Sequence, residues 1–591
     1  MTRNFPLSYR VRRHNTYPFS PTGDPTVDTP AWEALVTAVN NYTPTGKSSE
    51  IVIRDNAQSM VLDTANSPTD TSEFLKGCMV SGETRNSRIQ YNNGYIINWG
   101  RYGNPIRVTD AYSWFTRGTM TAMPAFSSRI QSPTISLAKG DWVLVWSTDN
   151  LSGVAPHHSG GQQRSAELHR VNHQDGGGWI LDGFVVDPLT TTPSICKIDM
   201  LRGCGMRNLT FGSNGVDDIL DTSQKSCVYL SRCHQAEIED IYADDTGCGA
   251  ISLQLCSDSR ISNFSGTWQF NNRFTYAVTF GVLNNCVYQD SVWHGTRHIL
   301  TSNGLQVTDG DGIRYGTARN CAGRNLDNHV AGDQFDFAFA SCDLHAESWE
   351  FEFDTCRVTT SMYWDGLTEE FFAYSTRARR TRFKNCAFTS CITQGAQVDD
   401  AGSKPPGRYA YEKFYGQPAN GIRVMGNDCQ IINFQQNGGW RGALIQNDTV
   451  STSFAPQRTV IKGGTFENVT GGVIYNTSTS DGIELLDTTI KNCGQYYTPS
   501  GSPAFHGSVV RLSGGTGHKI RRNDIDKGQN GYFLYAGTCA ASDLSVQNNS
   551  LLGYGSGKAG IYGATGGPHG VPTANGDSIN TAVAAKNNVD P

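Results

Sequence analysis

Cysteines at a fixed distance from apolar residues recur along the middle of the chain. An apolar residue stands three positions before the cysteine, and asparagine often precedes the cysteine directly. These pairs are Leu201–Cys204, Leu230–Cys233, Leu253–Cys256, Leu283–Cys286, Phe339–Cys342, Phe353–Cys356, Phe383–Cys386 and Ile490–Cys493. A second apolar residue follows five positions after a cysteine at Leu209, Ile238, Ile261, Leu326 and Phe434. The chain therefore repeats a short unit of alternating buried and exposed positions.

The separation of successive cysteines, roughly 20 to 35 residues over most of this stretch, predicts a β-solenoid. In a β-solenoid each coil of two or three strands stacks on the next at about 4.8 Å, so equivalent positions form ladders. We expect leucine and phenylalanine ladders inside, cysteine stacked on cysteine at a buried corner, and asparagine on asparagine at the turns. Parallel strands with short turns favour an all-β fold, the right-handed parallel β-helix.

Four segments are expected along the chain. Residues 1–27 are polar and arginine-rich, and are expected to form an arm. Residues 28–200 are expected to hold a capping helix and the first irregular coils, 201–550 the regular coils with inserted loops, and 551–591 a glycine-rich cap or oligomer contact. A helix would cover the open end of the solenoid, where unpaired strand edges invite aggregation. Helical spacing of apolar residues over 28–42 predicts it, at Ala31, Leu35, Val36 and Val39.

Amino-acid composition and net charge restrict the expected fold class and the expected partners. Charged residues make up 17% of the chain and glycine contributes 64 residues, which suits short strands and tight turns. The net charge is −6 without a basic block, so neither nucleic acid nor an anionic membrane is an expected partner. No apolar run approaches the roughly 18 residues that span a bilayer. The first 20 residues lack the apolar core of a secretory signal, so we expect synthesis in a cytoplasm without a signal peptide.

The 16 cysteines are expected to be reduced packing residues. A chain of this length buries a large core without disulfides, and no Cys-x-x-Cys pair suggests a zinc site. We therefore expect no metal and no cofactor.

The segment "GDPTVDTPAWEALVTAVN" resembles the capping segment of pectate-lyase-like right-handed β-helices, in particular those of bacteriophage tailspikes. Asp24, Asp28 and Thr29 match the usual pattern of that segment, and the remaining positions depart from it. The resemblance implies a homotrimeric fibre in the virion tail. Such a fibre binds, and often cleaves, a host surface polysaccharide such as lipopolysaccharide O-antigen or capsule. Attachment to the tail or to an adaptor protein would use residues 1–27.

Outward carboxylates are the first candidates for catalysis. A glycoside hydrolase needs two carboxyl groups about 5 to 9.5 Å apart. The alternation of apolar and polar residues over 332–356 predicts which side chains point outward. The outward carboxylates are Asp336, Glu350, Glu352 and Asp354. The aromatic residues between them are expected inside: Trp349, Phe351 and Phe353. Repulsion within this group would keep one member protonated, as a general acid requires. The alternative is a solvated strand face without a catalytic role. A second cluster sets Asp365 beside Tyr363 and Trp364, whose rings could stack on a sugar.

Histidines provide a second chemistry. A lyase acting on an acidic sugar needs an arginine for the uronate carboxylate and a histidine or tyrosine as base. The candidates are Arg297 and His298 in "HGTRHIL" and His329 in "NLDNHVAGD". The alternative is that these histidines lie in turns and bond to nearby backbone, without a catalytic role. The preferred hypothesis is a tailspike endoglycosidase. The alternatives are a polysaccharide lyase and a non-enzymatic receptor-binding or structural fibre.

Overall fold

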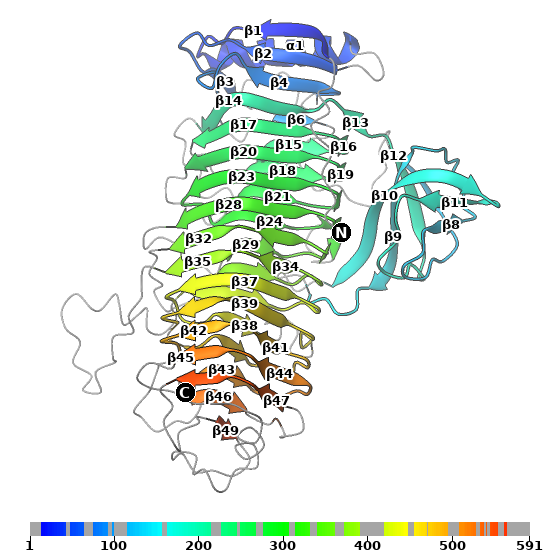
Figure 1. The fold of residues 1–591 in the computed structure, drawn as a ribbon. Helices are drawn as coiled ribbons and strands as arrows, with labels where there is room; N and C mark the ends of the chain where they lie inside the picture. Colours follow the sequence, from blue (N-terminus) through cyan, green and yellow to red (C-terminus); the bar gives the residue numbers. More distant parts are fainter. Residues whose placement is uncertain are drawn as a thin grey trace. The chain divides into compact units, whose positions relative to one another are not determined.

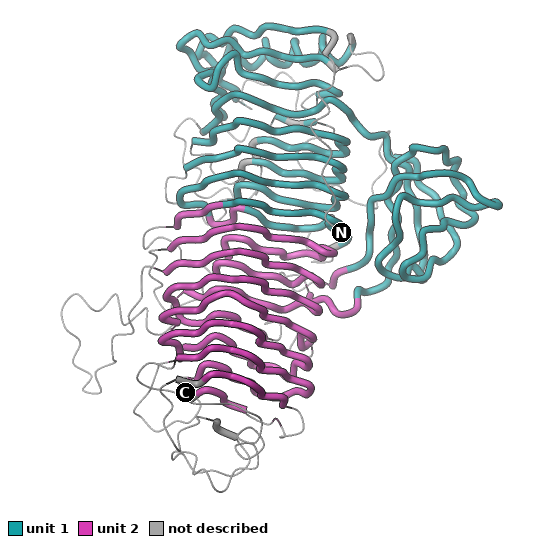
Figure 2. Tube along the Cα trace, in the orientation of Figure 1, with its two compact units in different colours: residues 1–151, 164–296, 300–326 teal, residues 152–163, 297–299, 327–591 magenta. Residues whose placement is uncertain are grey.

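The structure is a computed structural model. It describes residues 13–42, 48–63, 75–92, 97–99, 115–156, 162–213, 226–244, 249–267, 276–306, 314–330, 340–360, 372–390, 419–446, 454–469, 471–494, 508–526, 532–536, 539, 544–552 and 561–563. Of the predicted site residues, Asp336, Tyr363, Trp364 and Asp365 lie outside these ranges. The chain divides into two compact units (Figure 2). Unit 1 comprises residues 1–151, 164–296 and 300–326, and unit 2 comprises 152–163, 297–299 and 327–591.

The amino-terminal part of unit 1 combines a helix with parallel strands (Figure 1). The helix α1 (Pro25–Tyr42) begins three residues before the predicted start, because the Asp24 carboxylate accepts a hydrogen bond from the Thr26 amide (2.8 Å) as an N-cap. The strand β1 (Arg13–Phe19) lies in the segment expected to be an arm, and it pairs in parallel with β2 (Ser48–Ile53). No helix in the described part of the chain has the length and hydropathy to cross a membrane.

The residues that match the tailspike capping pattern attach this helix to the first strands. The Asp28 carboxylate is buried and accepts hydrogen bonds from the backbone amides of Thr22 (2.9 Å) and Val61 (3.0 Å). The Thr29 hydroxyl accepts one from the Asp63 amide (3.0 Å). Both side chains thus satisfy backbone donors between the helix and the coil beneath it.

The coils of unit 1 contain three parallel sheets, which confirms the predicted parallel β-helix. Register is kept from coil to coil: Met206 lies beside Ile238, Ile238 beside Ile261, and Ile261 beside Tyr288. The first sheet contains β3 (Met60–Asp63), β4 (Cys78–Gly82), β5 (Arg88–Asn92), β14 (Gly205–Ser213), β17 (Glu237–Asp244), β20 (Arg260–Thr267) and β23 (Val287–His294). The second contains β6 (Ile97–Trp99), β15 (Ser226–Ser231), β18 (Gly249–Gln254) and β21 (Tyr276–Phe280). The third contains β13 (Leu201–Arg202), β16 (Cys233–His234), β19 (Cys256–Ser257), β22 (Leu283–Asn284) and β27 (Ala318–Arg319).

The cysteine repeat occupies two registers instead of the single ladder predicted. At this corner of the third sheet, Leu201 pairs with Cys233 and Cys256 pairs with Leu283. Between them Cys233 lies beside Cys256, because His234 pairs with Ser257. Cysteine also lies directly on cysteine in unit 2: Phe353 pairs with Phe383 and Arg357 with Ala387, which aligns Cys356 with Cys386. The 13 described cysteines are free and buried. Burial raises the pKa of Cys233 and of Cys386, which keeps both thiols protonated.

The predicted asparagine ladder is present at the turns and includes aspartate. Asn208 (φ 52°) and Asn263 (φ 50°) have the left-handed backbone conformation that asparagine tolerates better than most residues. The Asn263 amide donates a hydrogen bond to the Asp240 carboxylate of the preceding coil. Hydrogen bonds between side chains of successive coils thus accompany the tight turns.

A lateral antiparallel sheet replaces the irregular coils expected over residues 115–200. It contains β7 (Phe115–Thr119), β12 (Ser194–Ile198), β9 (Trp142–Asn150) and β10 (Gln163–Asp175). The strand β11 (Gly178–Leu181) pairs with β10, and β8 (Arg129–Gln131) pairs with β11. Both faces of β9 are buried. Leu144 packs in a cluster with Leu255 and Val282 of the coils, whereas Val143 and Val145 pack in a second cluster with Ile130 of β8 and Leu181 of β11. This double burial explains why "WVLVW" lacks the alternation of a half-exposed strand.

Unit 2 repeats the coil with an aromatic core. The rings of Phe353 and Phe383 stack at 5.3 Å with an interplanar angle of 4°, and Tyr374 packs edge-on against Phe383 at 5.6 Å. Two strands, β24 (His298–Ser302) and β28 (Ala322–Val330), contain residues of both units. The first sheet contains β31 (Glu352–Asp354), β32 (Arg357–Thr360), β34 (Arg382–Lys384), β35 (Ala387–Ser390), β37 (Gln430–Asn437), β39 (Val460–Glu467), β41 (Glu484–Leu486), β42 (Thr489–Lys491), β44 (His518–Arg521), β45 (Asp524–Asp526), β47 (Leu544–Gln547) and β48 (Ser550–Leu552). The second contains β29 (Ala340–Leu344), β33 (Phe372–Thr376), β36 (Asn420–Val424), β38 (Ala443–Ile445), β40 (Ile474–Asn476), β43 (Ser508–Leu512), β46 (Tyr532–Ala536) and β49 (Ile561–Gly563), and the short β30 (Ser348–Trp349) belongs to the third sheet.

Candidate functional site

The outer face of the first sheet in unit 2 carries two rows of polar side chains. Side chains alternate along each strand, so in β28 Asp327 and His329 point outward while Asn328 and Val330 are buried. The pairing register continues both rows over the next coils. The first row is Asp327, Arg357, Ala387, Gln435 and Thr465, and the second is His329, Thr359, Thr389, Asn437 and Glu467.

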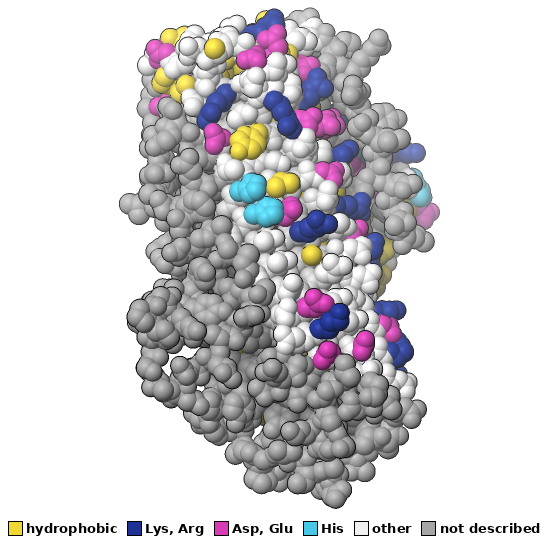
Figure 3. Space-filling view, turned by 60° about the vertical axis from the view of Figure 1, so that its left-hand side comes forward, with side chains coloured by type: hydrophobic (Ala, Val, Ile, Leu, Met, Phe, Trp, Pro, Cys, Tyr) yellow, Lys and Arg dark blue, Asp and Glu magenta, His cyan; other side chains and the backbone are white. Residues whose placement is uncertain are grey.

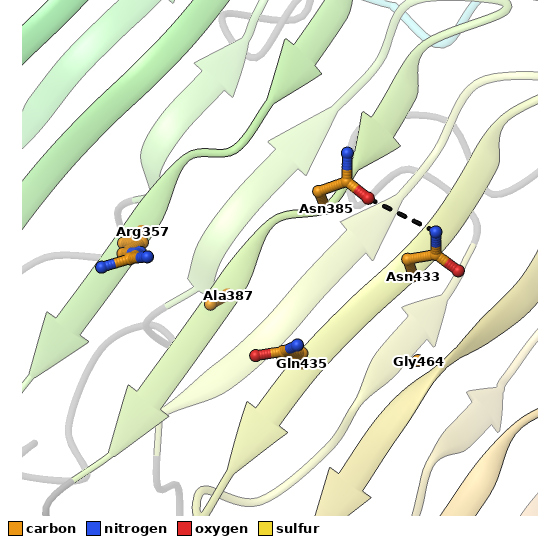
Figure 4. A pocket seen from close by; sticks show the side chains of 6 residues that line it. All are labelled: Arg357, Asn385, Ala387, Asn433, Gln435 and Gly464. Atoms are coloured by element: carbon orange, nitrogen blue, oxygen red, sulfur yellow. Dashed lines mark hydrogen bonds between the residues drawn. The ribbon is translucent and has the colours of Figure 1, made fainter.

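A groove of about 470 Å³ lies over the first row, where Arg357, Ala387 and Gln435 line it together with Asn385, Asn433 and Gly464 (Figure 4). Its volume falls within the range typical of ligand sites. Ala387 lies between Arg357 and Gln435, and its methyl group leaves the space that two longer neighbours enclose. Gly464 (φ 89°) lines the far end, where an added Cβ would lie 2.1 Å from the Phe434 carbonyl oxygen. The groove therefore depends on small residues at two of its positions.

Two exposed polar side chains in this groove have no side-chain partner among the described residues. Neither Arg357 nor Gln435 forms a side-chain hydrogen bond or an ion pair there. Other arginines of unit 2 do form ion pairs: Arg380 Nη1 lies 3.5 Å from Glu350 Oε1, and Arg458 Nε contacts the Asp428 carboxylate. Asp327 lies beside Arg357 in the strand register, but the two form no ion pair among the described residues. A guanidinium that forms no ion pair and lines a groove is suited to bind an anionic ligand group, such as a carboxylate, with two parallel hydrogen bonds.

The asparagines of the groove are held by the turn ladder. Asn433 Nδ2 donates to Asn385 Oδ1 (3.3 Å, Figure 4), and Asn385 Nδ2 donates to Asp354 Oδ1 (3.1 Å). Both asparagines have left-handed φ angles of 52°. The ladder fixes the orientation of the two amides, so their remaining donor and acceptor positions are available to sugar hydroxyls.

A histidine–aspartate pair extends the same rows. His329 Nε2 lies 3.4 Å from Asp327 Oδ1, with 42% and 29% of the two side chains exposed. The register places Asp327 beside Arg357 and His329 beside Thr359 on the next coil. An exposed imidazole oriented by a carboxylate is a candidate general base, and the guanidinium one strand away could neutralise an acidic substrate group.

The carboxylates predicted to share one strand face lie in different local surroundings. Glu350 lies in a left-handed turn (φ 56°) between β30 and β31, whereas Glu352 lies in β31 beside Arg382 of the next coil. Asp354 in turn lies 3.6 Å from Lys384. Trp349, Phe351 and Phe353 are buried, as expected. Thus Glu350 does not share a strand face with Glu352 and Asp354, and cations of the next coil lie beside all three.

The structure also separates the predicted lyase residues. His298 is fully buried in β24 of the second sheet, while His329 lies on the outer face of the first. Burial and the nearby Arg297 guanidinium lower the pKa of His298 well below its usual range. Burial alone would raise the pKa of Asp343 next to it, but His345 and Arg423 hold this pKa below the usual range. Of this set, only His329 lies on the outer sheet face that carries the groove.

Charges of both signs are mixed on the outer surface. Figure 3 shows Lys and Arg side chains alternating with Asp and Glu on the face turned forward, without a large area of one sign. Several pair across coils in unit 1: Arg85 lies 3.3 Å from Asp240, and Arg88 lies 3.0 Å from Asp244. An anionic ligand would therefore be held by individual groups, because the field of this surface is weak.

No family model matches the sequence, and a comparison with curated proteins finds no match. Solved structures are similar in fold. The tailspike protein gp49 of Pseudomonas phage LKA1 aligns with 91% of this chain and 75% of its own, with a TM-score of 0.52 and 13% identity. The tailspike gp61 of Pseudomonas phage phi297 covers 93% of this chain and 76% of its own (TM-score 0.49, 15% identity). The gp54 tailspike of Acinetobacter baumannii bacteriophage AP22, solved with a capsular saccharide, covers 90% and 74% (TM-score 0.47, 12% identity).

The similarity to the LKA1 protein shows that the chain has the fold of a phage tailspike. At this identity it concerns the fold alone, so the chemistry must be argued from the residues of this chain.

Sequence reasoning missed the groove. Arg357 follows Cys356, Ala387 follows Cys386 and Gln435 follows Phe434, each directly after the corner residue of its coil. Aligning the coils on their corner residues would have placed these three side chains in one column. Their common exposure still requires the register that the structure provides.

Proposed function

We propose that this tailspike-like β-helix binds an acidic host surface polysaccharide, an O-antigen or capsule, in the groove lined by Arg357, Asn385, Asn433 and Gln435. The observation that carries the proposal is the exposed Arg357 guanidinium, which has no partner among the described residues and lies in a groove of fixed amides. The guanidinium would bind a sugar carboxylate, and the amides would exchange hydrogen bonds with hydroxyl groups.

Cleavage by β-elimination is a second part of the proposal, favoured by the His329–Asp327 pair next to Arg357. Arg357 would neutralise the uronate carboxylate and thereby acidify the C5 proton. His329, oriented by Asp327, would accept that proton, and the electron pair would expel the glycosidic oxygen at C4. The products are an unsaturated uronate end and, after protonation of the leaving oxygen, a saturated end.

Hydrolysis by paired carboxylates is the alternative chemistry, with Asp336, Glu350, Glu352 and Asp365 as its candidates. Glu350 lies in a turn 3.5 Å from Arg380, and Glu352 lies beside Arg382 of the next coil, so the two carboxylates do not face each other across one strand face. Tyr363 and Trp364 remain candidate sugar platforms for this alternative. Arg297 and His298 are not part of the proposed groove.

The experiment is digestion of host polysaccharide by the purified chain, with the products sized and their ends identified. A lyase gives a rise in ultraviolet absorbance, whereas a hydrolase gives new reducing ends without it. We expect His329→Gln to reduce the cleavage rate by about 100- to 10,000-fold while binding is retained. The matched control is His173→Gln, on the exposed end of β10. Products without the ultraviolet absorbance contradict elimination, and unchanged size with retained binding identifies a receptor-binding fibre.

The assembly completes the proposal. We propose a homotrimer in the virion tail, attached to tail or adaptor proteins through the amino-terminal residues 1–27, without nucleic acid or membrane insertion. Within this segment, residues 13–19 form β1 and pair with β2. Light scattering of the purified chain should give three times its mass of 64.4 kDa, and a monomer would contradict the trimer.

A further inference from the structure

Three side chains whose nitrogen or oxygen atoms could ligate a metal ion lie together in the second sheet of unit 2, away from the proposed groove. His298 is the first residue of β24, Asp343 lies in the neighbouring strand β29, and His345 follows that strand directly. One donor atom from each lies within 4.8 Å of the others, and all three residues are buried. His345 Nε2 lies 3.0 Å from Asp343 Oδ2, and the two imidazole rings are nearly perpendicular with centroids 5.4 Å apart.

We propose that His298, Asp343 and His345 bind a divalent transition-metal ion of the zinc class. Two imidazole nitrogens and one carboxylate oxygen form a three-residue ligand set that zinc accepts, with a fourth position for water. Bonds of about 2.0 to 2.2 Å would bring the donor atoms to roughly 3.3 Å from one another.

The backbone around the cluster orients one ligand for metal binding. His298 Nδ1 is hydrogen-bonded to the Ala340 carbonyl oxygen, and a carbonyl can only accept. The proton therefore resides on Nδ1, and the lone pair resides on Nε2, which is the nitrogen a metal would use. Imidazole ligands of metals commonly donate their second N–H to a carbonyl in this way.

Neighbouring cations decide which metals fit. Arg297 precedes His298, and the register of the second sheet leads from Asp343 through Ser375 to Arg423. Arg423 Nε donates to the Ser375 hydroxyl (3.1 Å), which holds its charge on the same outer face. Calcium and magnesium depend on several anionic oxygens, and this site offers one carboxylate near two guanidiniums. Nitrogen ligands instead favour zinc, nickel or copper.

The ion would connect neighbouring coils. It would join β24 to β29 and stabilise the buried charge of Asp343, and it requires no saccharide. The inference is therefore independent of the proposed function, and a chain that fails to bind polysaccharide could still bind the metal.

The test uses the full chain after treatment with a chelator and dialysis. Titration with Co²⁺ should produce the visible absorption bands of a low-coordinate site at one equivalent per chain, and Zn²⁺ should abolish them while Ca²⁺ and Mg²⁺ should not. His345→Gln and His298→Gln should weaken binding by more than the roughly 10- to 100-fold loss typical when a residue that only hydrogen-bonds to a metal ligand is replaced. His173→Gln, an exposed histidine of β10, is the matched control and should retain the bands.

Thermal unfolding provides a measurement that needs no variant. Excess Zn²⁺ should raise the Tm of the chelated wild-type chain, because an ion that binds only the folded state stabilises it. If neither histidine variant folds, as judged by circular dichroism, the Tm shift of the wild-type chain with Zn²⁺ tests whether the metal binds. Absence of both the Co²⁺ bands and the Zn²⁺ shift in the wild-type chain would overturn the proposal. So would bands that persist unchanged in a folded His345→Gln chain.

Discussion

Replacing Glu167 with glutamine is expected to loosen the lateral sheet of unit 1 from its coils. Glu167 in β10 is fully buried, with Oε2 at 3.2 Å from His169 Nε2 and 3.0 Å from Arg319 Nη1. Its Oε1 accepts a hydrogen bond from the Val186 amide (2.7 Å). Because Arg319 lies in β27 of the coils, this buried pair connects the lateral sheet to them.

The size of the effect follows from the burial of Arg319. The substitution keeps the volume of Glu167 but leaves a guanidinium with 5% exposure next to a neutral side chain. Removing one partner of a buried ion pair costs about 3–5 kcal/mol. If the loss is confined to local opening of the sheet, hydrogen exchange of its amides accelerates by about 100- to 4,000-fold.

The pH dependence has a defined sign. Burial alone would raise the pKa of Glu167, but the hydrogen bond from His169 and the charge of Arg319 hold it below its ordinary value of 4.5. A lowered pKa in the folded state means that the stabilisation is present above pH 4.5 and is lost as the pH falls through the folded value. The difference in the stability of the lateral sheet between the wild-type chain and Glu167→Gln should therefore become smaller below pH 4.5.

The assay is native-state hydrogen exchange read strand by strand. Amides of β9, β10 and β12 should accelerate in Glu167→Gln, while those of β37 in unit 2 serve as an internal reference. Glu83→Gln is the control, since Glu83 forms an exposed pair with Arg54 (2.6 Å). Adding Arg319→Met should restore part of the protection, because no buried charge then lacks a partner. Equal exchange in Glu167→Gln and Glu83→Gln would refute the reasoning.

Three further predictions concern the coils. Phe353→Ala should destabilise unit 2 by about 3–5 kcal/mol, because a fully buried ring stacked at 5.3 Å leaves a cavity, and limited proteolysis should cleave the variant faster than Glu352→Gln. Asn208→Ala should lower the Tm more than Asn208→Gly, since its φ of 52° strains alanine and suits glycine, and an equal loss would contradict that reason. A thiol reagent should modify the 13 buried cysteines only after unfolding, so that rapid reaction of any of them in the native chain would contradict the packing.

The coil architecture was predictable because solenoid ladders impose a repeat on the sequence. The spacing of apolar residues predicted the stacked strands, and the asparagines predicted the turn ladder seen at Asn263 and Asn433. The capping resemblance also held in detail, since Asp28 and Thr29 both bind backbone amides of the coil beneath. These features are local or periodic, which is why a single sequence records them.

The lateral sheet and the cysteine registers were not predictable in the same way. In β9 the residues Leu144 and Val145 are buried on opposite faces, so the strand lacks the alternation that identifies a half-exposed strand. The motif of an apolar residue and a cysteine describes two different corners, because leucine at one coil stacks on cysteine at the next. Leucine and cysteine both suit a buried corner, and spacing alone does not separate the two registers.

The groove depends on small residues as well as on polar side chains. The small residues in its lining are Ala387 and Gly464, and neither alanine nor glycine indicates a binding site in a sequence. His298 and His329 looked alike as turn histidines, but one is fully buried beside Asp343 and the other is exposed beside Asp327. Burial of this kind follows from the three-dimensional packing of coils, which a sequence pattern does not specify.

Affinity for an acidic polysaccharide before and after chemical reduction of its carboxyl groups tests the central claim most directly. Arg357→Gln should weaken binding of the native polysaccharide by about 10- to 100-fold, as expected for loss of a charge-assisted hydrogen bond. Arg458→Gln, which removes an arginine already paired with Asp428, should leave the affinity unchanged. Carboxyl reduction should weaken the wild-type chain to the level of Arg357→Gln and change that variant little. Equal affinity of the wild-type chain for native and reduced polysaccharide, or equal losses in the two arginine variants, would contradict the account.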